Sequence, residues 1–159
     1  MIIFGTRPEI IKLYPVIKQM KDACLVWTGQ HNELAIQMLK DFKIKPDKTL
    51  GVMTKNQSLT SLTIRLHREL SKLYEGLEPE LVIVQGDTTS AMVAALEAYY
   101  HKILVVHIEA GLRTNDIYAP FPEEVNRRII TQIASYNFSP TLTAKAWCDL
   151  QGWGKNYKV

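Results

Sequence analysis

Residues 103–114 read Ile-Leu-Val-Val-His-Ile-Glu-Ala-Gly-Leu-Arg-Thr. The aliphatic run from Ile103 to Val106 is typical of a strand that is covered on both faces of a parallel sheet. A carboxylate at Glu109 and a guanidinium at Arg113 follow the strand, and packing alone explains this pair of charges poorly. Because ligands bind beyond the carboxyl ends of strands in open α/β sheets, the stretch predicts both a parallel sheet and an active site at its edge.

Strand-like and helix-like segments alternate along the rest of the chain. This alternation indicates an α/β protein with a Rossmann-like, doubly wound parallel sheet, formed as one domain over residues 1–159. Pro8, Thr88 and Pro122 suit the caps or first turns of helices. We expect strands at 1–4, 23–28, 48–53, 81–86, 103–108 and 136–139. We expect helices at 8–21, 32–43, 58–76, 88–100, 123–135 and 141–150.

The composition is that of an ordinary soluble domain. The net charge is +3 and the Lys and Arg residues are spread evenly, which argues against a nucleic-acid-binding or membrane-binding protein. No segment predicts a membrane span or a signal peptide, so we expect a cytoplasmic location. Cys24 and Cys148 lack a CxxC spacing and are expected to be separate thiols rather than a disulfide or a metal site.

Acidic residues follow two further segments of the predicted fold. Asp87 comes directly after the apolar run 81–86, and Glu123 begins a helix after the rigid sequence Pro-Phe-Pro. Taken singly, either acid could serve only as a helix cap or as a partner of the helix dipole. Together with Glu109, they place three carboxylates at one edge, where one can act as a base and another as an acid. Their spacing does not predict a metal site.

Positive charge is expected at the same edge. Gly5 permits a tight turn after the first strand, the free amides at the start of the next helix attract anions, and Arg7 and Lys12 add full charges. The stretch therefore predicts a phosphate cradle, with solvated charges at a helix start as the equally weighted alternative. Gln30 and His31 end the second strand, where they could bind a ligand or cap the next helix.

Five motifs occur in the order GTRPE (5–9), TGQH (28–31), QGDT (85–88), HIEAGLRT (107–114) and PFPEEVNR (120–127). In this order they resemble the N-terminal half of the non-hydrolysing UDP-N-acetylglucosamine 2-epimerase family. The resemblance covers essentially the whole chain. It implies the N-terminal domain of a glycosyltransferase-B-like architecture, whose C-terminal nucleotide-binding domain is absent from this chain.

The family reaction inverts C2 of UDP-GlcNAc to give UDP-ManNAc without a cofactor. The C2 hydrogen is not acidic, and the resembling enzymes are thought to eliminate UDP, form 2-acetamidoglucal and then add UDP back. The resemblance implies catalytic roles for Asp87, Glu109 and Glu123, with the assignment of acid and base left open. Positions that would contact the substrate or its departing diphosphate are Arg7, Lys12 and Arg113. Positions associated in some members with a regulatory second substrate molecule are Gln30, His31 and Arg65.

Two other functions remain open for a chain of this kind. It could be a non-catalytic module that binds a sugar nucleotide, or the epimerase half for a different UDP-2-acetamido sugar. Because the family's second domain supplies further substrate contacts, we expect these 159 residues alone not to epimerise. The expected partners are UDP-GlcNAc and UDP, with no nucleic acid or membrane, and a homodimer is compatible with the family.

Overall fold

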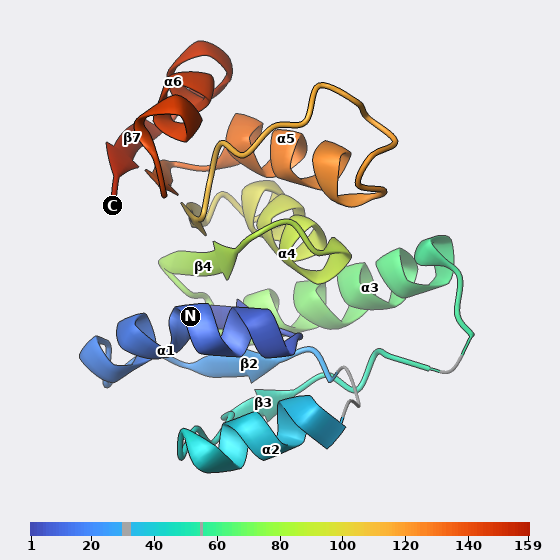
Figure 1. Ribbon diagram of the computed structural model, residues 1–159. Coiled ribbons are helices and arrows are strands. Elements are labelled where there is room, and N and C mark those ends of the chain that lie inside the picture. The colour runs from blue at the N-terminus through green and yellow to red at the C-terminus, as the bar shows by residue number, and fades with distance from the viewer. Residues whose placement is uncertain (30–32, 55) are drawn as a thin grey trace.

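The computed structural model describes residues 1–29, 33–54 and 56–159, and its core is a seven-stranded parallel sheet (Figure 1). The strands are β1 (Ile2–Phe4), β2 (Leu25–Trp27), β3 (Lys48–Thr49), β4 (Leu81–Gln85), β5 (Leu104–Ile108), β6 (Tyr136–Ser139) and β7 (Lys155–Lys158). The helices are α1 (Arg7–Gln19), α2 (Glu33–Asp41), α3 (Leu59–Leu77), α4 (Thr89–Tyr100), α5 (Glu123–Ile133) and α6 (Leu142–Gln151).

The strand order is β3-β2-β1-β4-β5-β6-β7, and every neighbouring pair is parallel. The order runs one way from β1 to β3 and the opposite way from β4 to β7. Right-handed crossovers therefore place α1 and α2 on one face of the sheet and α3, α4 and α5 on the other. The predicted doubly wound α/β fold is confirmed, and its topological switch point lies between β1 and β4.

Two apolar clusters hold these layers together. On one face, Leu66, Leu70 and Tyr74 of α3 pack with the small side chains of α4 against the central strands. On the other face, Ile10 and Leu13 of α1 pack against β1 and β2. Helix α4 is apolar on nearly all sides because it lies between α3, α5 and the sheet, and its alanines allow these neighbours to approach closely.

The expected elements agree with the structure, with differences at their ends. Each helix begins and ends within two residues of its predicted bounds, whereas the strand expected over 48–53 is reduced to Lys48–Thr49. Strand β7 was not predicted, because its sequence Lys-Asn-Tyr-Lys is polar and lacks the apolar pattern of a strand. The run 103–106 is also not covered throughout, since Leu104 at the amino end of β5 is 47% exposed.

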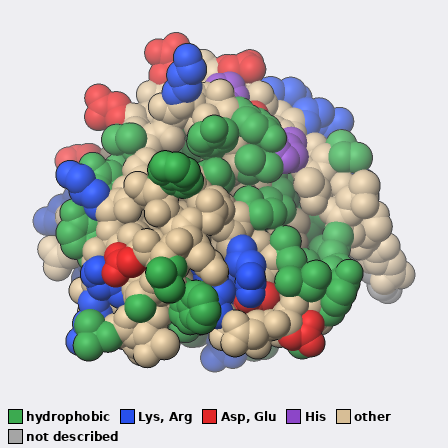
Figure 2. All heavy atoms as spheres, turned by 90° about the horizontal axis from the view of Figure 1, so that it is seen from above, with side chains coloured by type: hydrophobic (Ala, Val, Ile, Leu, Met, Phe, Trp, Pro, Cys, Tyr) green, Lys and Arg blue, Asp and Glu red, His purple; other side chains and the backbone are tan. Residues whose placement is uncertain are grey.

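The surface mixes charges of both signs. Figure 2 shows Lys, Arg, Asp and Glu side chains interspersed among hydrophobic ones on the face that it displays. Over the described residues, none of the helices combines the length and the apolar character that crossing a bilayer requires. Cys24 and Cys148 are both free thiols.

Gly111 provides a test of how the loop after β5 packs. Its φ of +86° favours glycine, and a Cβ atom at this position would lie 1.9 Å from the carbonyl oxygen of Ala144 in α6. We expect Gly111→Ala to lower the free energy of unfolding by about 3 kcal/mol or more, as measured by urea denaturation.

The control substitution is Gly76→Ala near the end of α3. A Cβ atom there meets open space, so the change should raise the free energy of unfolding by about 0.5 kcal/mol. Equal effects of the two substitutions would contradict the close approach of α6 to Gly111.

Candidate functional site

A cavity of about 370 Å³ opens at the switch point, beyond the carboxyl ends of β1, β4 and β5. The two halves of the sheet send their helices to opposite faces here, which leaves the space between the loops after β1 and β4 uncovered. The lining residues are Thr6, Arg7, Pro8, Glu9, Lys12, Gln85, Gly86, Asp87, Thr88 and Glu109. The cavity thus brings together four of the predicted site residues: Arg7, Lys12, Asp87 and Glu109.

Glu109 is held by charge and by a hydrogen bond. Lys12 Nζ lies 2.7 Å from Glu109 Oε1 and 2.6 Å from Oε2, and Gln85 Nε2 donates to Oε2 at 2.5 Å. The backbone at Glu109 has a φ of +67°, a conformation that non-glycine residues adopt rarely and that often marks a functional position. Lys12 therefore already binds one of the expected catalytic carboxylates.

Asp87 pairs with a buried arginine that the sequence reasoning missed. Arg127 Nη2 lies 2.5 Å from Asp87 Oδ2, and the side chains of these two residues are 10% and 25% exposed. Burial raises the pKa of Asp87, and Arg127 opposes this rise; the charges of Glu123 and Glu109 add to it. Glu109 and Glu123 therefore both lie close enough to influence Asp87.

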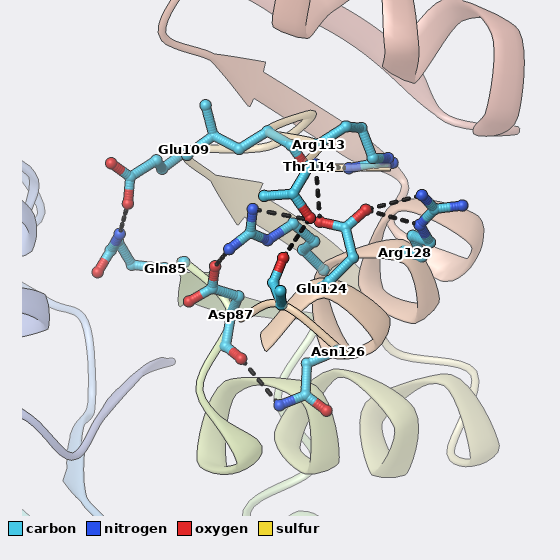
Figure 3. A network of polar contacts seen from close by, with 12 residues as sticks. Gln85, Asp87, Glu109, Arg113, Thr114, Glu124, Asn126 and Arg128 are labelled. Carbon is cyan, nitrogen blue, oxygen red and sulfur yellow. Dashed lines mark hydrogen bonds and ion pairs between the residues drawn. The ribbon is translucent and has the colours of Figure 1, made fainter. Parts of the chain in front are cut away.

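Helix α5 supports this arrangement through a second buried carboxylate (Figure 3). Glu124 is fully buried, contacts Arg127 and Arg128, and accepts a hydrogen bond of 3.2 Å from the backbone amide of Thr114. It thereby ties the loop after β5 to α5. The signal was present in the sequence, because Glu124 stands three and four residues before Arg127 and Arg128, the spacing of neighbours on one helix face.

Two backbone amides that precede the expected phosphate cradle at the start of α1 are occupied within the chain. The backbone amides of Gly5 and Thr6 both donate to Glu9 Oε2, at 2.7 and 2.6 Å, and so are not free to bind an anion. Glu9 reaches back because it is the third residue of α1 and forms a capping box with Thr6. Gly5 also serves a close approach rather than a tight turn, since a Cβ atom there would lie 2.2 Å from Thr28 Oγ1.

Arg113 and Glu123 are not among the described residues that line the cavity. The Arg113 guanidinium donates to Gln151 of α6 and Thr131 of α5, and Figure 3 shows it on the opposite side of the loop from the Glu109 carboxylate. Its predicted place beside Arg7 and Lys12 is therefore not found in this structure. Glu123 is partly buried at the start of α5, near Asp87.

Arg65 is the one residue of the expected regulatory site that lies within the described residues, and it does not line this cavity. Arg65 lies on α3, donates to Thr54 Oγ1 at 3.2 Å and lines a separate cavity of about 620 Å³. Gln30 and His31 lie outside the described residues. Within the described part of the chain, no group of three or more His, Cys, Asp and Glu residues could hold a metal ion.

Comparisons with known proteins match this fold and these motifs. A family model described as UDP-N-acetylglucosamine 2-epimerase matches residues 17–148. A UDP-N-acetylglucosamine 2-epimerase of Bacillus subtilis is 43% identical over 150 residues, which cover 91% of this chain and 40% of that protein. The chain spans about two fifths of the length of the curated relatives that it matches.

Solved structures agree. The UDP-GlcNAc 2-epimerase of Neisseria meningitidis bound to UDP-GlcNAc superposes with a TM-score of 0.87 and 42% identity, over 94% of this chain and 42% of that one. A UDP-GlcNAc 2-epimerase of Methanocaldococcus jannaschii in complex with UDP-GlcNAc and UDP gives a TM-score of 0.86 and 32% identity, over 96% of this chain and 45% of that one.

The pairing of Asp87 with Arg127 predicts a specific effect on titration. In Arg127→Met, Asp87 loses the cation that opposes its burial, so its pKa should rise further, as measured by carboxyl NMR titration. A carboxyl group whose pKa is higher in the folded than in the unfolded protein destabilises the folded protein as the pH rises through that pKa. The substitution should therefore lower the free energy of unfolding more at pH 7 than at pH 4. At pH 7 we expect the free energy of unfolding to fall by about 2 kcal/mol, a figure that already allows for the partial exposure of Asp87.

Arg128→Met is the matched control for this substitution. Arg128 also contacts Glu124, with its Nη2 at 2.7 Å from Oε1, but it makes no ion pair with Asp87 in the described structure. We expect Arg128→Met to leave the pKa of Asp87 unchanged. The same pKa change in both variants would contradict a specific role for Arg127.

Proposed function

The chain belongs to the UDP-N-acetylglucosamine 2-epimerase family, and from this we propose that it forms the N-terminal portion of an isomerase that interconverts UDP-GlcNAc and UDP-ManNAc. The observation that carries the proposal is the cavity at the switch point, where Arg7 and Lys12 of α1 lie with the carboxylates of Asp87 and Glu109, which follow β4 and β5. Cations suit a diphosphate, and carboxylates suit the movement of a proton.

The proposed reaction proceeds by elimination and re-addition. The bond between C1 of the sugar and the UDP oxygen breaks, UDP departs with the electron pair, and a base removes the proton from C2 to give 2-acetamidoglucal. A proton is then delivered to the opposite face of C2, and UDP bonds to C1 again. Arg7 and Lys12 would stabilise the negative charge of the departing diphosphate.

The surroundings of the carboxylates suggest a division of roles. Glu109 binds Lys12 and accepts a hydrogen bond from Gln85, and these contacts hold its carboxylate at the cavity, where it would serve as the base. The pKa of Asp87 is raised by burial, which suits a group that holds and returns a proton. Glu123 would balance positive charge that develops on the sugar ring.

The wider setting is proposed from the resemblance. A second, nucleotide-binding domain would close the cleft from the other side. Gln30, His31 and Arg65 would serve a regulatory second substrate molecule. The enzyme would work in the cytoplasm, as a homodimer, in the synthesis of cell-envelope polysaccharides.

A chimera tests whether these residues form an epimerase half. Residues 1–159 are joined to the remaining part of the Bacillus subtilis relative, and conversion of UDP-GlcNAc is followed by a coupled assay for UDP-ManNAc. We expect the chimera to turn over and the 159-residue chain alone not to do so. Robust turnover by the chain alone would contradict the need for a second domain.

Calorimetric titration with UDP and UDP-GlcNAc distinguishes the alternatives. A chimera that binds both ligands without turnover would indicate a non-catalytic binding module. Turnover of another UDP-2-acetamido sugar in preference to UDP-GlcNAc would indicate a different substrate.

Substitution of the carboxylates tests the mechanism. In the chimera, Glu109→Gln and Asp87→Asn should each lower kcat by about 100-fold or more, because neither amide can exchange a proton with C2. Glu75→Gln is the control, since Glu75 lies exposed on α3, away from the cavity, and accepts a hydrogen bond from Ser71. An equal loss of activity in the control would point to a general effect on folding.

A further inference from the structure

The turn from β4 to α4 is held at three consecutive residues by three different elements. His107 Nε2 of β5 lies 2.7 Å from the carbonyl oxygen of Gly86. Asn126 Nδ2 of α5 donates to the carbonyl oxygen of Asp87 at 2.9 Å. The Thr88 hydroxyl donates to Glu9 Oε1 of α1 at 2.8 Å.

The three residues that hold this turn are buried polar groups with no place in the proposed chemistry. His107 is fully buried, while Glu9 and Asn126 are 2% and 4% exposed. Burying a polar side chain is costly unless it makes hydrogen bonds. Burial also lowers the pKa of His107 to about 4, which keeps the ring neutral near pH 7 and allows Nε2 to carry the single donor hydrogen.

Capping of α4 alone does not require this arrangement. Thr88 Oγ1 accepts a hydrogen bond of 3.1 Å from Ala91, and Thr141 Oγ1 caps α6 in the same way, at 3.1 Å from Ala144. The Thr88 hydroxyl additionally donates its hydrogen to a buried carboxylate. Gly86, with a φ of +71°, provides the bend that turns the chain between these contacts.

We propose that His107, Asn126 and Glu9 are positioning residues that form a clamp on the turn Gly86–Thr88 and thereby fix the Asp87 carboxylate at the cavity. The clamp holds the backbone on both sides of the Asp87 side chain, while Arg127 binds the carboxylate itself. A carboxylate that exchanges a proton with C2 must stay within hydrogen-bond reach of it, and small displacements are costly in rate. The catalytic part of this inference rests on the proposed function.

The clamp itself is measured without catalysis, by amide hydrogen exchange in the purified chain. The Gly86 amide donates to the carbonyl oxygen of Ile108 and reports on the turn, while the Val84 amide reports on β4. In Asn126→Ala and Thr88→Val, we expect exchange at Gly86 to become about tenfold faster relative to Val84. Thr141→Val removes a matched helix cap outside the site and should leave this ratio unchanged.

The effect on catalysis is measured with the same variants in the chimera. Asn126→Ala and Thr88→Val should lower kcat by about tenfold with KM within about twofold, because substrate-binding cations are untouched. Thr88→Ser keeps the hydroxyl and should restore kcat, and Thr141→Val should leave it unchanged.

Two results would overturn the clamp. One is a ratio of Gly86 to Val84 exchange rates that is unchanged in both variants. The other is a raised ratio together with an unchanged kcat. If the unsubstituted chimera has no epimerase activity, the proposed function fails, whereas hydrogen exchange still decides whether the clamp fixes the turn.

Discussion

The reversal of strand order between β1 and β4 is the constraint on which the site depends. Because α1 and α4 leave the sheet toward opposite faces, the loops that precede them separate and leave a cavity between them. Polar side chains at these strand ends can therefore reach a ligand while their backbone remains anchored in a buried sheet. The positions of Arg7, Asp87 and Glu109 are consequences of this topology.

Burial of charge near the cavity requires a partner for each group. Asp87 and Glu124 share Arg127, and Arg128 adds a second cation to Glu124. An isolated carboxylate at the fully buried position of Glu124 would be strongly unfavourable, whereas the shared network satisfies it and joins α5 to the loop after β5. The ion pairs are thus best understood as devices that fix geometry rather than as a main source of stability.

The sequence predicted the sheet, the helices and the edge at which the cavity opens, because these follow from apolar periodicity and from the order of strands and helices. It did not predict which polar groups form hydrogen bonds or ion pairs with one another at that edge. Arg113 turns toward α5 and α6 because contacts with distant segments decide its direction, whereas Glu9 binds the amides of Gly5 and Thr6 in a local capping box. Strand β7 escaped prediction because its polar sequence has no apolar pattern.

Two ion pairs help several carboxylates to share one edge at the cavity, while the buried carboxylate of Glu9 is held by hydrogen bonds. Lys12 neutralises Glu109, and Arg127 neutralises Asp87. Each pair weakens the repulsion that would otherwise separate the acids, although the influence of Glu109 and Glu123 on the pKa of Asp87 shows that the repulsion is not abolished. The remaining cation, Arg7, lies exposed at the rim and adds positive charge where the cavity opens. An anionic ligand would therefore meet positive charge first and the carboxylates only after it enters.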